Sequence, residues 1–451
     1  MSRTTTSEAS SSSTGDYRIS AGSPWIGAWR YPAFVGALGL GIAAYGSWFD
    51  QDRFPFSYLF GYFVALSLAL GSLFFILVLY LTKASWGVTV RRIAELFIRR
   101  SPMVALIILM IPLILTARHL FPWLGAPSHA DESAEHVEPL AEARGDQARE
   151  PAGLRDLPVA SPVRMDRAER QAEEHIVDHK RVYLNWFFFV ARLLVYFLVW
   201  GGIAQLYFRW STEQDTSRAL ENTALAQHYA PAGMILFALT ITFFSFDWLL
   251  SLDATWYSTI FGVQVFAQCA LFQMAALILS TLLLKRSGLL GKAVNVEHYH
   301  DMGKLLFGWI VFWSYVSFAQ FFLTWYSNIP DEVAWFHKRW DDHEGSWMGV
   351  SITLVLLHFF VPFWFLMSRN IKRRLPLLAA GAICIVLMHL VEVYWIIMPN
   401  LGPLAPSLLD VGCLFGVLGI YLATVLYGMQ DYALIPVGDP RLVRALEFEN
   451  A

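Results

Sequence analysis

The sequence predicts an all-α, polytopic membrane protein with about ten transmembrane helices. The first observation is composition: the 451 residues are 56% hydrophobic and 16% aromatic but only 15% charged. A soluble protein of this length could not bury so much apolar surface, so lipid must be the solvent for most of it. The second is pattern, because ten apolar stretches each approach the ~20 residues that a helix needs to cross a bilayer. The net charge of −3 excludes only a strong nucleic-acid binder.

Apolar length sets the bounds of each expected helix, beginning with a short first stretch that contains four glycines. Gly36, Gly39, Gly41 and Gly46 follow no strand and lack the G-x-G-x-x-G spacing of a nucleotide-binding loop. They predict that the first helix packs closely on another helix. The other stretches are read as helices on their length. In order, the expected helices are 31–49, 56–82, 102–121, 183–208, 230–251, 257–284, 302–326, 347–368, 375–398 and 409–428.

The distribution of Lys and Arg predicts the orientation of these helices. Residues 1–23 have no apolar core and no small-residue cleavage site, so we expect no signal peptide. With the N-terminus inside, the inside connections carry 15 basic residues and the short outside connections carry 3. This bias predicts that both termini are cytoplasmic. The expected domains are a cytoplasmic tail at 1–30, a transmembrane domain at 31–428 and a second cytoplasmic tail at 429–451.

A long charged loop at 122–182 interrupts the apolar pattern. It is rich in Ala, Glu, Arg and Pro and shows no clear amphipathic period. Long loops translocate whatever their charge, so we expect this loop outside. Two interpretations are open, a disordered or loosely helical loop and a docking surface for a partner.

Five ionisable residues at membrane depth are the main candidate functional residues. A charge near the bilayer centre costs at least about 2.5 kcal/mol. We therefore expect Arg192 to pair with Asp247 or with Glu392. His389 and Glu392 share one face of the ninth helix through their i, i+3 spacing, and His358 lies near the middle of the eighth.

These residues permit two roles. Their ion pair could only hold helices together, or the acids and imidazoles could form the outer half of a proton path with trapped water. Candidates for the inner half are sparser: Asp301 and Lys304 at the start of the seventh helix, with His298 and His300 beside them, and Glu95 ahead of the third.

The sequence offers few ligands for a cofactor. Cys269, Cys384 and Cys413 form no C-x-x-C pair, which argues against an iron–sulfur cluster or a covalently attached haem. His358 and His389 form one histidine pair at different apparent depths, so we expect neither haem nor metal on this chain.

A quinone site is a further possibility on the outer side. Such a site needs an aromatic cleft, a hydrogen-bond donor and an acid that can receive a proton. His389, Glu392, Asp247 and Tyr394 could supply these groups.

Two stretches are specific enough to indicate a family. They are SFDWLLSLDATWYSTIFGVQVF at 245–266 and HYHDMGKLLFGWIVFWSYVSFAQFFLTWYSNIPDEVAWF at 298–336. Together they closely resemble ActF, an integral membrane subunit of bacterial alternative complex III, which is a quinol:cytochrome c oxidoreductase. That family is in turn similar to the NrfD/PsrC-like membrane subunits of polysulfide-reductase-type enzymes. The ten-span layout matches as well, so the resemblance covers most of the chain outside 1–23 and 122–182.

The resemblance implies a fold, partners and cofactors. The implied fold is two four-helix bundles in parallel repeat, spans two to five and six to nine, flanked by the first and tenth spans. The implied partners are a paralogous NrfD-like quinol-binding subunit, a multihaem cytochrome c subunit, an iron–sulfur subunit and small membrane subunits. Haem c and iron–sulfur clusters belong to those partners, so this chain is expected to bind no cofactor except, in one interpretation, a quinone.

The matched stretches also imply site residues. Asp247 and Asp253 belong to FDWLLSLD, and Asp301 and Lys304 belong to HDMGK, which implies a role in proton transport for these four. The same resemblance implies a bacterial inner-membrane location.

The sequence therefore predicts a membrane subunit of a quinol-oxidising respiratory complex that supports assembly and offers a proton path, without a complete redox reaction of its own. The alternatives are a subunit that binds quinol and takes direct part in its oxidation, a purely structural scaffold, and a stand-alone transporter. The expected path residues are Asp247, Asp253, His389, Glu392, Arg192, His358, Asp301 and Lys304.

Overall fold

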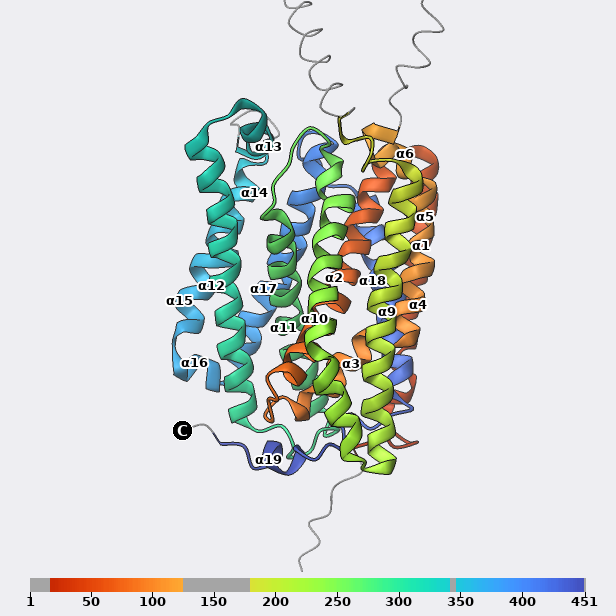
Figure 1. Cartoon of the computed structure of the whole chain (residues 1–451), viewed down its shortest axis with the longest axis vertical. Coiled ribbons are helices and arrows are strands. Elements are labelled where there is room, and N and C mark those ends of the chain that lie inside the picture. The colour runs from red at the N-terminus through yellow and green to blue at the C-terminus, as the bar shows by residue number, and fades with distance from the viewer. Residues whose placement is uncertain (1–16, 125–178, 341–345, 450–451) are drawn as a thin grey trace, which may run out of the picture.

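The computed structural model describes residues 17–124, 179–340 and 346–449, and every regular element within them is a helix. Ten helical segments in this part are long and apolar enough to span a membrane. Figure 1 shows them standing side by side as one bundle, with the connections at its two ends. The expected all-α, multi-pass architecture is confirmed. Most of the predicted loop at 122–182 lies outside the described residues.

Each span corresponds to one long helix or to a few short ones in series. In order, the spans are η1 (Pro24–Gly27) with α1 (Arg30–Phe49), α2 (Arg53–Leu81), α3 (Val88–Ile98) with α4 (Arg100–Leu109) and α5 (Ile111–Leu115), α9 (Trp186–Ser217), α10 (Leu220–Trp248) with η3 (Leu250–Leu252), α11 (Phe261–Arg286), α12 (Val296–Ser327), α14 (Met348–Thr353) with η4 (Leu354–Phe360) and α15 (Val361–Met367), α17 (Leu375–Ile397) with η5 (Met398–Asn400), and α18 (Leu408–Met429). The short elements between or after them are α6 (Ala117–Leu120), η2 (Pro122–Leu124), α13 (Pro330–Trp340), α16 (Arg369–Arg373) and α19 (Leu442–Leu446).

The two ends of the bundle are distinct. Figure 1 shows α6 and α13 at one end and α19 at the other, and we call these the α13 end and the α19 end. The backbone N–H of Leu434, after α18, donates to the carbonyl of Tyr17, before α1, at 2.9 Å. The chain therefore enters the first span and leaves the tenth at the same end.

Several helices continue past their expected bounds at the α19 end. The third span starts at Val88 rather than at 102, the fourth ends at Ser217 rather than at 208, and the fifth starts at Leu220 rather than at 230. The seventh starts at Val296 rather than at 302, because the Asn295 side chain accepts hydrogen bonds from backbone N–H groups of the first turn. Apolar length marks only the part of a helix that lies in lipid, whereas capping and hydrogen bonds carry the helix into water.

α2 and α11 form the centre of the molecule, and most of their residues are buried. α2 packs against α3 and α10, and α10 packs against α9. α11 packs against α12 and α17, and α17 packs against η4. The contacts thus group the second to fifth spans and the sixth to ninth spans into two bundles that meet where α2 touches α11, as expected. α1 and α18 pair with each other and flank α2.

Glycines allow α1 and α18 to approach closely, which confirms the prediction from the first stretch. A Cβ on Gly36 would lie 2.6 Å from the backbone nitrogen of Ile420, and one on Gly39 would lie 2.4 Å from that of Gly416. Such contacts exclude any side chain unless the backbone moves. Gly41 differs, because a Cβ there would meet nothing within 4 Å.

We therefore predict that Gly39→Leu destabilises the protein and that Gly41→Leu does not. The first change forces a side chain into the backbone of α18, at the upper end of the ~1–3 kcal/mol that overpacking costs. Thermal unfolding of each purified variant in detergent measures the difference. Equal midpoints for the two variants would contradict the close packing of α1 on α18.

Buried ion pairs hold the segment that follows α18 against α3. Asp439 lies 2.7 Å from Arg91, and Glu95 lies 2.9 Å from both Arg91 and Arg92. Burial opposes the charge on Asp439, but Arg91 and Arg441 together outweigh it and hold the pKa of this carboxyl well below its usual range. Glu95, an expected contributor to the inner half of a proton path, is thus a counter-ion for two arginines.

Candidate functional site

The polar residues predicted at membrane depth fall into separate groups. Arg192 on α9 pairs with Asp247 on α10, whereas Glu392 on α17 faces His358 on η4. Among the described residues, no hydrogen bond or ion pair joins the first pair to Glu392. The sequence predicts a single outer path, but the structure separates Arg192 and Asp247 from Glu392 and His358. The charges of Arg192 and Asp247 neutralise each other.

The Arg192–Asp247 pair is largely buried, with the Asp247 side chain fully buried and the Arg192 side chain 18% exposed. The guanidinium donates to both carboxylate oxygens, from Nε at 2.8 Å and from Nη2 at 2.9 Å. The Tyr196 hydroxyl donates to the same carboxylate at 2.6 Å, and the guanidinium stacks on the ring of Tyr183 at 3.9 Å. A bidentate pair with an added hydroxyl leaves the carboxylate little capacity for another ligand. This geometry best fits an ion pair that holds α9 to α10.

Tyr394, expected at a quinone site with Asp247, belongs to another closed group. Its hydroxyl donates to Asp410 at 2.9 Å, and Asp410 lies 2.7 Å from Arg53. Ser57 also donates to Asp410, at 2.6 Å. Two residues of the expected quinone site therefore have other hydrogen-bond partners: Tyr394 bonds to Asp410, and Asp247 bonds to Arg192.

Glu392 is the centre of the remaining group and is fully buried. Its Oε1 accepts a hydrogen bond from the Trp313 indole N–H at 2.6 Å. Its Oε2 lies 3.7 Å from Nδ1 of His358 and has no hydrogen-bond partner in the described chain. The His358 ring stacks on Trp313 with centroids 4.1 Å apart. One carboxylate oxygen is thus fixed, and the other faces an imidazole.

His358 occupies an irregular turn of the eighth span. The segment Leu354–Phe360 is a π-helix between two α-helical parts. Pro362 follows four residues after His358 and has no N–H to donate to that carbonyl, so the regular helical ladder is broken there. Such insertions are frequent at functional sites. The wider turn carries a fully buried imidazole whose two nitrogens have no hydrogen-bond partner in the described chain.

His389 lies one turn before Glu392 on the same helix and joins the two bundles. Its Nε2 is 2.8 Å from the hydroxyl of Ser67 on α2, and its ring stacks on Phe272 of α11 with centroids 4.1 Å apart. Its Nδ1 is buried and has no partner among the described residues. This imidazole therefore lies at the contact between the central helices, close to Glu392.

A cavity of about 570 Å³ ends at Glu392. Its walls are mostly aromatic and come from α12, α13, η4 and α17, with Gln264 and Gln320 as further polar groups. Tyr315, Phe318 and other wall residues are exposed on the flank of the bundle, so the cavity opens sideways toward lipid. Asp247, His389 and Tyr394 do not line it. The cavity thus retains only Glu392 of the expected quinone-site residues.

Glutamines on α11 extend this polar region into the centre of the molecule. Gln264, Gln268 and Gln273 are buried, and each has at least one amide atom without a partner in the described chain. Gln264 and Gln268 share a face through their i, i+4 spacing. Buried amides of this kind are normally satisfied by ordered water. Gln264 and Gln268 therefore suit a hydrated passage, whereas Gln273 faces Gly71 of α2 from another side of α11.

The other residues implied by the resemblance lie at the two ends of the bundle. Asp253 at the α13 end is 2.6 Å from Lys338 of α13. Burial opposes the charge on Asp253, but Lys338, Thr255 and Arg339 together outweigh it and lower the pKa of the carboxyl. Asp301 and Lys304 form an ion pair within the first turns of α12. Each acid thus has a neighbouring lysine, and neither touches Glu392.

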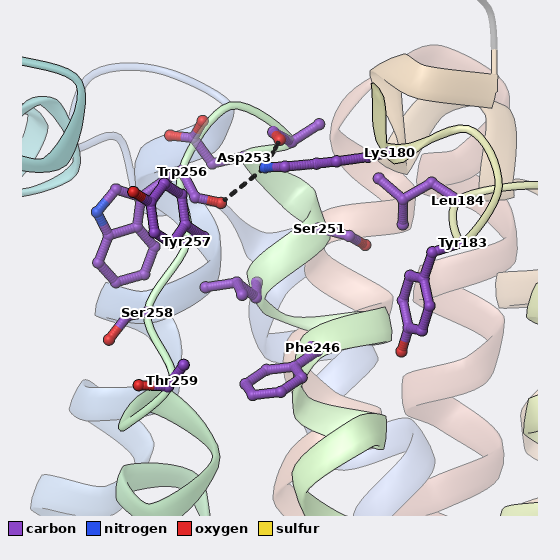
Figure 2. Close-up of a pocket in the computed structure, with 12 residues that line it drawn as sticks. Lys180, Tyr183, Leu184, Phe246, Ser251, Asp253, Trp256, Tyr257, Ser258 and Thr259 are labelled. Carbon is purple, nitrogen blue, oxygen red and sulfur yellow. Dashed lines mark hydrogen bonds between the residues drawn. The ribbon is translucent and has the colours of Figure 1, made fainter. Parts of the chain in front are cut away.

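A second, smaller cavity of about 260 Å³ lies at the α13 end (Figure 2). Lys180 extends across it to the loop that follows η3, and its ammonium donates to the carbonyl of Ala254 at 2.6 Å. Tyr183 and Phe246 are among the side chains that form its walls. This cavity is separate from the one at Glu392, since the two share no lining residue.

Some residues of the site were missed from the sequence. Trp313 and Ser67 are single residues in apolar helices, with no spacing that distinguishes them from packing residues. Gln273 carried a usable signal, because it is a third glutamine after Gln264 and Gln268 in one apolar stretch. Within the described ranges, no cluster of three or more His, Cys, Asp or Glu side chains is arranged to hold a metal ion.

Comparison with known proteins adds no assignment. No protein-family model matches the chain, and no curated protein is significantly similar to it. What is established is a helical protein with ten segments suited to span a membrane.

Proposed function

We propose that this chain is an integral membrane subunit of a quinol:cytochrome c oxidoreductase of the alternative complex III type. It provides a scaffold and a route for protons, while haem c and iron–sulfur clusters on partner subunits carry the electrons. The resemblance of residues 245–266 and 298–336 supports the assignment to this kind of complex. The same resemblance supports a bacterial inner-membrane location, and the Lys and Arg bias supports an orientation with the α13 end outside and both termini in the cytoplasm.

The observation that carries the proton route is the pairing of Glu392 with His358 inside apolar helices. Both groups accept and release protons, and they are 3.7 Å apart with one carboxylate oxygen free. A single water or a small side-chain rotation completes a hydrogen bond over that distance. Trp313 holds the other oxygen, so the carboxyl keeps its position while its proton moves.

The route continues toward the centre of the molecule. His389 lies on the same face of α17 as Glu392, and its ring bonds to Ser67. Phe272 of α11 packs against the ring of His389, and Gln268 and Gln273 lie on the same helix. Water bound to their unpartnered amide atoms carries the proton route from His389 toward the α19 end. Asp247 and Arg192 are outside this route because they satisfy each other.

Purification of the tagged full chain from its own membranes tests the assignment. We expect a multihaem cytochrome c subunit, an iron–sulfur subunit and a paralogous membrane subunit to copurify, and the preparation to reduce cytochrome c with quinol. A chain that purifies alone from gently solubilised membranes and moves a solute by itself would overturn the proposal in favour of a stand-alone transporter.

The cavity at Glu392 favours a second candidate function, direct binding of quinol. Its volume of about 570 Å³ is within the range of small-molecule sites, ~300–1,000 Å³. Aromatic walls suit a quinone ring, the open flank admits a molecule from lipid, and Glu392 is placed to receive its proton.

Val355→Trp distinguishes this candidate from the first. Val355 lines the cavity, whereas its neighbour Leu356 is exposed on the same π-helix and does not line it. If quinol occupies the cavity, Val355→Trp raises the KM for quinol roughly tenfold or more and Leu356→Trp leaves it unchanged. The measurement is the quinol dependence of cytochrome c reduction by the purified complex. Equal KM values for both variants would remove quinol from this cavity.

A further inference from the structure

The smaller cavity at the α13 end has an apolar interior beneath a positive charge. Its walls include the apolar side chains of Leu184, Phe246, Leu250 and Trp256. Figure 2 shows Phe246 low in the cavity and Lys180 crossing above it from the segment that precedes α9. Since α10 ends beside it, the cavity lies where a span emerges from the hydrocarbon layer.

The charge of Lys180 has no carboxylate in contact with it among the described residues. Its ammonium is held by the carbonyl of Ala254 at 2.6 Å, with the carbonyls of Thr255 and Trp256 farther away at 3.4 and 3.5 Å. Asp253 is nearby but is engaged by Lys338 at 2.6 Å. Burial lowers the pKa of Lys180 from its usual value.

The rim of the cavity carries residues typical of the membrane interface. Tyr257 is exposed, and the Lys180 ammonium lies 5.7 Å from the centre of its ring. Tyrosine and tryptophan concentrate at the level of lipid headgroups, where their rings lie in the apolar layer and their polar groups reach water. The cavity therefore has a polar upper edge and an apolar lower part, as an amphiphile does.

We propose that this cavity binds one anionic phospholipid of the leaflet at the α13 end, with its phosphate at Lys180 and an acyl chain against Phe246 and Leu250. The carbonyl of Ala254 holds the ammonium at 2.6 Å, and a phosphate oxygen takes the place of the longer contacts to the carbonyls of Thr255 and Trp256. The bound lipid supplies an anion at a position where no carboxylate of the described residues contacts Lys180, and it fills the gap between the end of α10 and the segment before α9. This inference is independent of the proposed role in quinol oxidation.

Lipid retention tests the proposal. The full chain is purified within its complex and exchanged into nanodiscs of phosphatidylglycerol or phosphatidylcholine. Native mass spectrometry is expected to show one phosphatidylglycerol that survives activation and little retained phosphatidylcholine. Lys180→Gln is expected to lower that retention about fivefold, the effect of one lysine near anionic lipid. Thr259→Trp, at an exposed position on the cavity wall, is expected to lower it by steric exclusion.

Lys292→Gln is the matched control, because Lys292 is an exposed lysine at the α19 end. Loss of phosphatidylglycerol from Lys180→Gln and Thr259→Trp, with normal retention by Lys292→Gln, supports the site. Equal retention by all variants overturns it, as does phosphatidylcholine bound as tightly as phosphatidylglycerol. Loss of a partner subunit from Lys180→Gln with unchanged lipid retention also overturns it and makes the surface a protein contact.

Discussion

Glu392→Gln is expected to lower quinol-driven cytochrome c reduction by the purified complex at least about a hundredfold, the lower end of the ~10²–10⁴ that positioned proton transfer contributes. Glutamine keeps the length and shape of the side chain, and its carbonyl oxygen can accept the Trp313 hydrogen bond now made at 2.6 Å. It cannot release a proton. The assembled complex should form in normal yield while turnover falls.

Glu213→Gln is the control for this experiment. Glu213 is an exposed acid on α9 that pairs with Arg209, far in the fold from Glu392 and His358, so its loss should leave turnover unchanged. Normal turnover by Glu392→Gln in an intact complex would contradict proton exchange at this residue. The chain would then be a passive scaffold.

The Arg192–Asp247 pair should produce the largest change in stability. Either single substitution, Arg192→Met or Asp247→Leu, leaves one charge of a largely buried pair without its counter-ion and is expected to cost about 3–5 kcal/mol. The double substitution removes both charges and should recover most of that loss. Thermal unfolding with a thiol-reactive dye measures it, since Cys269 and Cys413 are buried in the folded protein.

The recovered double variant also tests the role of the pair. If stability and turnover both return, Arg192 and Asp247 only hold α9 to α10. Stable protein with lost turnover would place Asp247 in the proton route after all. A double variant as unstable as the singles would contradict a simple ion pair and indicate that the Tyr196 hydrogen bond to Asp247 is itself required.

The positions of the ten spans could be predicted because hydropathy is a local property. The expected second span, 56–82, and the observed α2, Arg53–Leu81, differ by only a few residues. The third span was predicted to start at 102 and starts at Val88, because its first turns are polar. Those turns are stabilised by residues distant in sequence, such as Asp439 against Arg91, which no local pattern shows.

The candidate site was predictable in its residues but not in their grouping. His389 and Glu392 could be placed on one helix face from spacing alone. The partner of Arg192 could not, since Asp247 and Glu392 were both chemically suitable and only the packing of α9 on α10 separates them. Tyr394 was assigned to the wrong neighbours, because its hydroxyl turns toward Asp410 of α18.

The residues of each segment are enough to show ten stretches suited to lipid and to identify the costly polar side chains that enter the apolar layer. Those properties follow from the transfer free energy of each segment, which depends on its own residues. The contacts of the site are visible only in the folded chain, where Trp313 holds Glu392, His358 faces the free oxygen of Glu392, and Glu392 lines an aromatic cavity. These contacts join helices distant along the chain, and their geometry is set by how the helices pack together.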